Sequence, residues 1–348
     1  MSQKRLFLLD AFALIFRGYY AFIKNPRINS KGMDTSAIMG FMNSLMDVIK
    51  REKPDHLAVA FDKGGSDYRF EMYQEYKAHR DETPEAIKIA VPYIQELLRA
   101  MHIPIIEKAG FEADDLIGTL AKQAEKEGYQ TFMVTPDKDF AQLVSENIFM
   151  YRPMFGGGYE TWGIPEVQKK FEVTDPLQVI DFLGMMGDAS DNIPGLPGVG
   201  EKTAKKFLAA YGSMENLLAN THELKGKMKE KIEANGELGL LSKKLATIML
   251  DVPVTFNAKD FELDHPDIPK VTEIFQELEF RRMIDNFTKT FAVQAETSPS
   301  ETPKKATETK TAPKEQASAG AGQFSLFGGD PSSAPQTETV SEFTRKTS

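Results

Sequence analysis

Seven carboxylate side chains stand where short apolar runs end or where a helical pattern begins: Asp10, Asp62, Glu112, Asp114, Asp115, Asp137 and Asp139. Carboxylates gathered in one cleft repel one another strongly unless cations lie between them. Ligation by oxygen alone favours hard ions such as Mg²⁺ or Mn²⁺, and the chain has no cysteine that would favour zinc. Two such ions in an acidic cleft are suited to the hydrolysis of phosphodiesters.

The elements that must position these acids are alternating strands and helices. Short, continuous apolar runs predict buried strands at 5–9, 56–61, 103–107, 131–134 and 148–151. Helical patterns lie between them at 11–22, 35–51, 84–101 and 113–127. This alternation predicts an α/β fold with a parallel sheet. Because open parallel sheets bind ligands outside the carboxyl ends of their strands, the acids are expected on one rim.

Residues 63–80 interrupt this rhythm with the charged and aromatic stretch DYRFEMYQEYKAHR. The segment follows the strand that ends before Asp62 and is too polar to be core. Its position predicts a lid or arch over the acidic rim. A solvated helical excursion is the alternative.

Beyond Pro176 the chain becomes rich in helical patterns and carries the turn GLPGVG before a helix. Backbone N–H groups of such a turn can approach a phosphate, and the helix dipole favours an anion there. Asp188 and Asp191 are expected on one face at the end of the preceding helix, from which they could complete the metal site. A plain helix–turn–helix corner is the alternative interpretation of this region.

Composition excludes several other classes of protein. Without cysteine there is no disulfide scaffold, thiol nucleophile or iron–sulfur cluster. The net charge of −9 argues against a general nucleic-acid binder unless the excess acid is concentrated at a metal site. No Walker, G-x-S-x-G or G-x-G-x-x-G motif offers a competing chemistry. No apolar run is long enough for a membrane span and no signal peptide is recognisable, so a soluble, cytoplasmic protein is expected.

Residues 289–348 are rich in Thr, Pro, Ser, Ala, Lys and Glu, and this composition predicts a disordered tail. One compact apolar cluster interrupts it at 323–327. This pentapeptide resembles the Q-L-x-L-F motif by which bacterial proteins bind the sliding clamp, with Phe324 in place of Leu. The anchors would be Gln323, Phe324, Leu326 and Phe327. A chance apolar fragment of linker is the alternative.

Six motifs closely resemble the 5′-nuclease domain of bacterial DNA polymerase I, a member of the flap-endonuclease family: LLDAFALIFRGYYAF, AVAFD, YRFEMYQEYKAHR, GFEADDLIGTLA, TPDKDFAQLV and GMMGDASDNIPGLPGVGEKTA. The match runs from about residue 4 to 282. It implies a PIN/flap-endonuclease-like α/β nuclease domain over 1–175, with a helical arch at about 63–90. A helical domain with a helix-hairpin-helix-type (H3TH) DNA-binding motif would follow over 176–288, and then the tail over 289–348.

The resemblance also implies site roles. The family's two-metal site has nine carboxylates, and all nine are present: Asp10, Asp62, Glu112, Asp114, Asp115, Asp137, Asp139, Asp188 and Asp191. The catalytic group would comprise the first five together with Lys77 and Arg80. DNA contacts are implied for Arg17, Arg69, Tyr73, Tyr76, Lys77, Arg80, Gly195, Gly198, Val199, Gly200, Lys202, Thr203, Lys205 and Lys206, with Tyr76 stacking on a base. The family's usual histidine is replaced by Phe70, for which no role is expected.

The implied function is that of a Mg²⁺-dependent 5′-3′ exonuclease and flap endonuclease, in which Mn²⁺ could substitute. Its partners would be flapped and RNA-primed DNA and the sliding clamp, without a membrane, and the protein would be a monomer associated with the nucleoid. One alternative is a non-catalytic module that binds DNA junctions within a larger DNA polymerase I. Another is a small PIN-type ribonuclease, which the arch and hairpin disfavour. The complete carboxylate set favours the enzyme.

Overall fold

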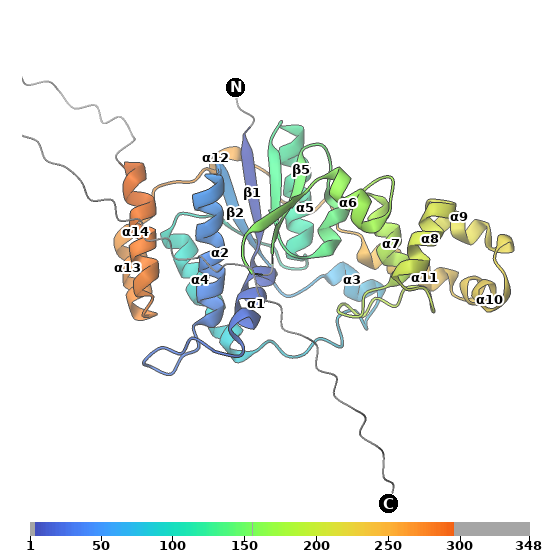
Figure 1. Cartoon of the computed structure of the whole chain (residues 1–348), viewed down its shortest axis with the longest axis horizontal. Helices are drawn as coiled ribbons and strands as arrows, with labels where there is room; N and C mark the ends of the chain where they lie inside the picture. The colour runs from blue at the N-terminus through green and yellow to red at the C-terminus, as the bar shows by residue number, and fades with distance from the viewer. Residues whose placement is uncertain (1–3, 155, 296–348) are drawn as a thin grey trace, which may run out of the picture. The chain divides into compact units, whose positions relative to one another are not determined.

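The computed structural model describes residues 4–154 and 156–295, which are built around a six-stranded sheet (Figure 1). The strand order is β3-β2-β1-β4-β5-β6, in which β1 to β5 are parallel and β6 is antiparallel. The chain adds β2 and β3 on one side of β1 and then returns to place β4 on the other. The strands are β1 (Arg5–Asp10), β2 (His56–Phe61), β3 (Ile105–Glu107), β4 (Gln130–Val134), β5 (Ile148–Pro153) and β6 (Tyr159–Trp162).

Both faces of the sheet are covered, which is why the strands are continuously apolar. On β1, Phe7 and Leu9 enter one hydrophobic core, whereas Leu6 and Leu8 enter the other. The first core is covered by α1 (Ala11–Phe22), α2 (Ser36–Glu52), α4 (Glu85–Ala100), α13 (Ile268–Glu277) and α14 (Arg281–Ala295). The opposite face carries α5 (Ala113–Lys126), the 3₁₀ helix η1 (Lys138–Leu143), α6 (Ile164–Phe171) and α12 (Ala258–Phe261). Figure 1 shows α2 and α4 on one side and α5 and α6 on the other.

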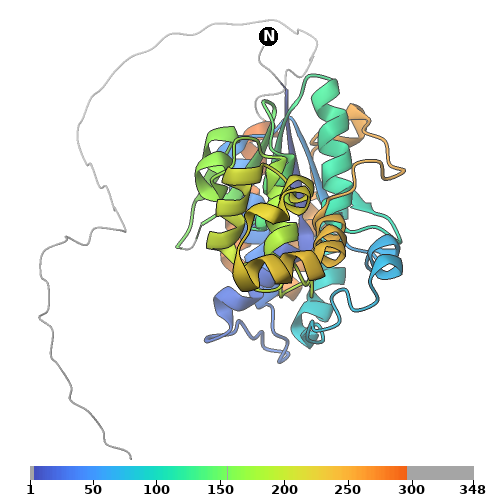
Figure 2. The ribbon, with the colours of Figure 1, turned by 90° about the vertical axis from the view of Figure 1, so that its right-hand side faces the viewer.

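A group of helices follows α6 and extends the hydrophobic cluster of the second face (Figure 2). They are α7 (Gln178–Met186), α8 (Glu201–Tyr211), α9 (Met214–Ala219), the 3₁₀ helix η2 (Thr221–Glu223), α10 (Gly226–Ala234) and α11 (Gly236–Ala246). Their buried side chains, among them Phe182, Leu196 and Leu245, belong to the same hydrophobic cluster as Leu8 of the sheet. The helical region and the sheet are therefore joined by one continuous core.

The predicted parallel α/β fold is confirmed, with three differences. Strand β6 was not predicted. Residues 63–84 contain only one short helix, α3 (Asp67–Met72), and otherwise turns or irregular chain, so the expected helical arch is largely non-helical. Helix α14 continues to Ala295, past the start of the predicted tail at 289. The pentapeptide at 323–327 lies outside the described residues, within which no helix is long and apolar enough to cross a membrane.

Candidate active site

The first carboxylates lie at the carboxyl ends of the neighbouring parallel strands β1 and β2. Asp10 ends β1 and caps α1, since its Oδ1 accepts a hydrogen bond from the Ala13 amide at 3.1 Å. Asp62 follows β2 and accepts from the amide of Ala113 at 2.8 Å, which ties the strand end to the start of α5. Burial, with the neighbouring charges of Asp62 and Asp137, raises the pKa of Asp10 to about 7. Asp10 and Asp62 are thus fixed close together by backbone hydrogen bonds.

The beginning of α5 brings three further acids to the same edge. Glu112 is the N-cap residue, and Asp114 and Asp115 lie in the first turn, where negative charge suits the helix dipole. Burial and the adjacent Asp115 raise the pKa of Asp114. These acids lie near Asp62, which accepts from the Ala113 amide at the same helix start.

Asp115 is the most enclosed of these acids, with no exposed surface. The guanidinium of Arg69 donates to both of its oxygens at 2.8 Å, and the Met249 amide donates to Oδ1 at 2.8 Å. Arg69 also donates to the carbonyls of Leu245 and Thr247, both at 3.0 Å, and is only 2% exposed. The predicted DNA contact by Arg69 is therefore wrong, because this side chain is an internal link between α3, α5 and the end of α11.

The other four acids come from two turns. Asp137 and Asp139 follow β4, where Asp137 Oδ1 accepts from the Asp139 amide at 3.0 Å. Asp188 and Asp191 lie in a loop and not on a helix face as expected, because Gly187, with φ of 75°, ends α7 one residue earlier. The loop is closed by the Asp188 and Ile193 backbones, which exchange hydrogen bonds at 2.8 and 2.9 Å.

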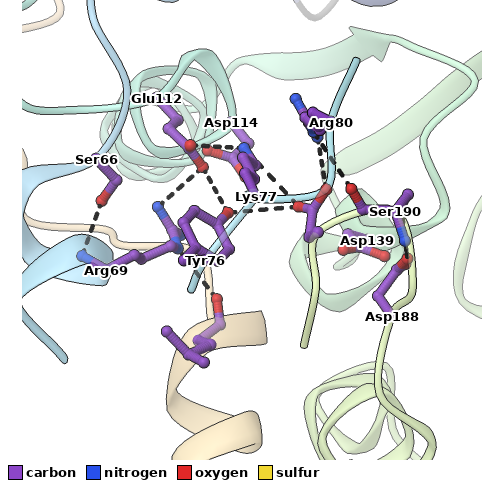
Figure 3. A network of polar contacts seen from close by, with 12 residues as sticks. Ser66, Arg69, Tyr76, Lys77, Arg80, Glu112, Asp114, Asp139, Asp188 and Ser190 are labelled. Carbon is purple, nitrogen blue, oxygen red and sulfur yellow. Dashed lines mark hydrogen bonds and ion pairs between the residues drawn. The ribbon is translucent and has the colours of Figure 1, made fainter. Parts of the chain in front are cut away.

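Basic side chains lie among the carboxylates (Figure 3). Lys77 Nζ is 2.6 Å from Glu112 Oε1 and 3.8 Å from Asp191 Oδ2, and Arg80 Nη2 is 2.5 Å from Asp191 Oδ1. Lys138 Nζ lies 2.5 Å from Asp188 Oδ2. With the cations so placed, no three acidic or histidine side chains within 4–154 and 156–295 form a ready-made metal cluster.

The segment that carries Lys77 and Arg80 is docked on the loop that carries Asp188 and Asp191. The Lys77 amide donates to the Asp191 carbonyl at 2.9 Å, and the Asn192 side-chain amide donates to the Glu75 carbonyl at 2.6 Å. Figure 3 shows Lys77 between Glu112 on α5 and the loop with Ser190. The predicted arch segment thus closes over the acidic edge.

Tyr76 does not have the exposed ring that base stacking requires. It is 3% exposed, and its hydroxyl donates to Glu112 Oε2 at 3.0 Å. Burial and the charge of Glu112 raise the pKa of this hydroxyl. The stacking role is therefore corrected to one of holding Glu112. Tyr73 is half-buried, and half-buried Arg17 donates to the Met154 carbonyl at 2.6 Å.

The glycine-rich turn has the backbone that its sequence predicts. Gly195 and Gly198 have φ of 64° and 87°, a region that favours glycine, and Gly200 is the N-cap of α8. Val199 is buried and Thr203 half-buried. Lys202 and Lys206 are exposed, whereas Lys205 is bound to Glu172 and Glu201 at 3.1 and 3.0 Å. Lys205 is thus the least available of the three for a phosphate.

Sequence reasoning missed two lysines. Lys138 lies within the motif Asp-Lys-Asp at a strand end, a signal that could have revealed a cation inside the site. Exposed Lys231, on α10, places its Nζ 3.0 Å from where a Cβ on Gly198 would stand. Its proximity to the turn depends on the packing of α10 and has no local sequence signal.

The donor set fits divalent ions. Every candidate ligand is a carboxylate, as hard cations prefer. Asp139 Oδ1 is a buried oxygen that lacks a hydrogen-bond partner in the described part of the chain, and burial together with Asp137 raises the pKa of Asp139. A divalent cation beside this oxygen would stabilise the charged form of Asp139.

The chain thus combines a parallel sheet with carboxylates at its strand ends and a helical region with a glycine-rich hairpin. The chain belongs to the 5′-3′ exonuclease family: its model for the N-terminal resolvase-like domain matches residues 5–173, and its model for the C-terminal SAM fold matches 174–269. The family relationship stated from the motifs is thereby confirmed.

Individual proteins of known name are similar to this chain over most of its length. The 5′-3′ exonuclease of Aquifex aeolicus is 37% identical over 289 residues, which cover 83% of this chain and 97% of that protein. The DNA polymerase I of Bacillus caldotenax is 41% identical over 286 residues, which are 81% of this chain but only 32% of the polymerase. The chain thus spans about a third of the length of the polymerase relatives. The flap endonuclease of bacteriophage T5, solved in a pseudo-enzyme-product complex with DNA and metal ions, shares the fold with a TM-score of 0.57 and 21% identity, over 84% of this chain and all of that one.

Proposed function

We propose that this chain is a structure-specific 5′-3′ exonuclease and flap endonuclease that hydrolyses phosphodiesters with two divalent ions, Mg²⁺ in the cell. The observation that carries the proposal is that acids from separate chain segments lie close together around basic side chains: Lys77 lies between Glu112 and Asp191, and Lys138 lies between Asp139 and Asp188. Arg80 also contacts Asp191, from the same segment as Lys77. Family membership and the T5 enzyme's complex with DNA and metal ions support it. The removal of 5′ flaps and RNA primers in replication and repair is the role we assign.

Two groups of side chains would hold the ions. Asp10, Asp62, Glu112 and Asp114 form the first, and Asp137, Asp139, Asp188 and Asp191 form the second. Asp115 supports the first group through Arg69. When bound, the ions would supply the activated nucleophile and neutralise charge on the phosphate.

The chain's own cations would hold the substrate. Lys77 and Arg80 lie above the carboxylates, where a phosphate that enters the site would meet them. The backbone amides of the turn at 195–200, with Lys202 and Lys206, suit the backbone of duplex DNA and carry no sequence preference. Binding at two places selects a junction between duplex and single strand.

The test is cleavage of a labelled 5′-flap duplex with Mg²⁺ and then with EDTA. We expect cutting near the junction with Mg²⁺ alone. Asp114→Asn should slow it about a thousandfold or more, while Asp260→Asn, an exposed acid on α12, should cut as the wild type does. Flap binding in Ca²⁺ should survive in both variants. Tight binding without cutting in Mg²⁺ or Mn²⁺ would instead identify a junction-binding module.

We further propose that the tail pentapeptide binds the sliding clamp and that the protein acts as a cytoplasmic, nucleoid-associated monomer. The pentapeptide's apolar residues, set in a stretch of otherwise polar composition, suit a hydrophobic pocket on a partner. Replacing Leu326 and Phe327 with Ala should abolish clamp binding in a pull-down with purified clamp. Unchanged binding would assign the pentapeptide to linker.

A further inference from the structure

Lys138 has a position that the proposed mechanism does not use. It is the first residue of η1, between Asp137 and Asp139, and it reaches across to the loop after α7. Its Nζ lies 2.5 Å from Asp188 Oδ2 and 3.9 Å from Asp139 Oδ1. One ammonium therefore links the strand-end acids to those of the helical region.

The carboxylates around Lys138 are recessed, whereas the lysine itself is accessible. The Asp188 and Asp139 side chains are 11% and 17% exposed, and that of Lys138 is 40% exposed. Asp188 Oδ1 is held by the amide and hydroxyl of Ser190, which leaves Oδ2 to the lysine. The lysine thus enters from solvent, on a flexible stem that can swing out again without moving the backbone.

A divalent ion in this group of acids needs the oxygens that Lys138 now occupies. An oxygen bonded to an ammonium at 2.5 Å cannot also serve a metal at full strength, and the two cations repel each other. The ion brings twice the charge and can bind several oxygens at once, whereas the ammonium contacts Asp188 closely and Asp139 only at long range.

We propose that Lys138 is a resident counter-ion of the second carboxylate group, formed by Asp137, Asp139, Asp188 and Asp191, and that a divalent ion displaces it on binding. The inference rests on the proposed metal-dependent function. It makes Lys138 a positioning residue, which holds the Asp188 loop against η1 until the ion arrives and weakens the ion's apparent affinity by competition.

The test measures Mn²⁺ binding to the full chain without DNA. The electron paramagnetic resonance signal of free Mn²⁺ reports how much of the ion remains unbound. Lys138→Gln should tighten Mn²⁺ binding at one class of sites about fivefold, the ratio that corresponds to loss of an ion pair of this exposure. Lys138→Arg should stay near wild type because it keeps the charge. Lys122→Gln is the matched control, since this lysine pairs with Glu125 on α5.

Each outcome decides the question. A purely structural role for Lys138 predicts affinity that is unchanged or weaker in Lys138→Gln, and either result would overturn the proposal. Asp139→Asn should weaken the same class of sites, which identifies them as the second group. If the wild type binds no Mn²⁺ at all, the metal-dependent function itself fails. If Mn²⁺ binds with the same affinity whatever residue stands at position 138, the counter-ion role of Lys138 is refuted and the metal-dependent function is not. A melting curve in EDTA confirms that each variant is folded.

Discussion

Arg69 and Lys138 meet carboxylates of the same site in opposite ways. The Arg69 side chain is 3% exposed, grips both oxygens of Asp115 and also binds two backbone carbonyls. The Lys138 side chain is 40% exposed, lies 2.5 Å from Asp188 Oδ2 and is 3.9 Å from Asp139 Oδ1. Lys77 stands between them at 19% exposure. The difference teaches that a basic residue in an acidic site can be part of the framework or a removable charge, and that burial and the number of hydrogen bonds separate the two.

The largest effect should come from breaking the framework pair. Arg69→Met leaves the buried Asp115 without its cation, and we expect a loss of about 3–5 kcal/mol in the free energy of unfolding. Urea denaturation measures it, and exposed Arg51→Gln serves as the control with little change. A loss as small as the control's would mean that Arg69 can be replaced without cost. The proposed difference between a structural Arg69 and a displaceable Lys138 would then be wrong.

Lys77, the cation of intermediate exposure, should affect the rate of DNA cleavage more than the free energy of unfolding. Lys77→Met removes the ammonium above Glu112, and single-turnover flap cleavage should slow about 100-fold. Flap affinity in Ca²⁺, measured by fluorescence anisotropy, should fall far less. Lys88→Met, a surface lysine on α4, is the control and should cut normally. Cleavage at the wild-type rate would place Lys77 with the framework residues.

His56 offers the smallest effect. It is a buried basic group that has no close ion-pair partner within 4–154 and 156–295. Its side chain is 3% exposed, lies against the Tyr129 ring and is 4.0 Å from Glu262, with Asp55 and Lys4 nearby. Neither ring nitrogen has a hydrogen-bond partner among the described residues. Burial, and then Lys4, lower the pKa of His56 below its ordinary 6.5.

The sign of the pH effect follows from this shift. The unfolded chain takes up a proton on His56 at higher pH than the folded protein does, so the contribution of His56 to stability falls as pH drops below about 6.5. Asp10, with its pKa raised to about 7, acts in the opposite direction over this range, so the effect of His56 is measured as a difference between variants. On going from pH 7.5 to pH 5.5 in EDTA, the melting temperature of His56→Phe should change more favourably than that of the wild type. The exposed His79→Gln variant should change as the wild type does. An identical change in His56→Phe would show that this histidine does not contribute to the pH dependence.

Much of the fold could be predicted because buried parallel strands leave a plain signal. The run HLAVAF corresponds to β2 without a change of boundary. Strand β6 was missed because YETW is short, polar at two positions and at the sheet edge, so it carries no continuous apolar run. The acids at the strand ends were found because topology alone brings them to one rim.

The rest of the site depends on contacts between distant segments. Nothing near Arg69 indicates that its guanidinium meets Asp115 on α5 and carbonyls at the end of α11, so its charged surroundings alone predict a DNA contact. The loop position of Asp188 did have a local signal, since Gly187 can end a helix. Lys138 had one as well, but the acid that it binds lies in another region of the chain.

The hydrophobic core shared by the sheet and the helical region has a further consequence. Leu8 beside the acidic edge and Leu196 in the glycine-rich turn belong to one continuous packed cluster, and packed interiors resist deformation. The hairpin and the carboxylates therefore keep a set separation. Under the proposed function, this fixed separation sets the position of cleavage. A duplex bound at the hairpin places one particular phosphodiester at the carboxylates. The cleavage site is therefore determined by distance along the DNA and not by base sequence.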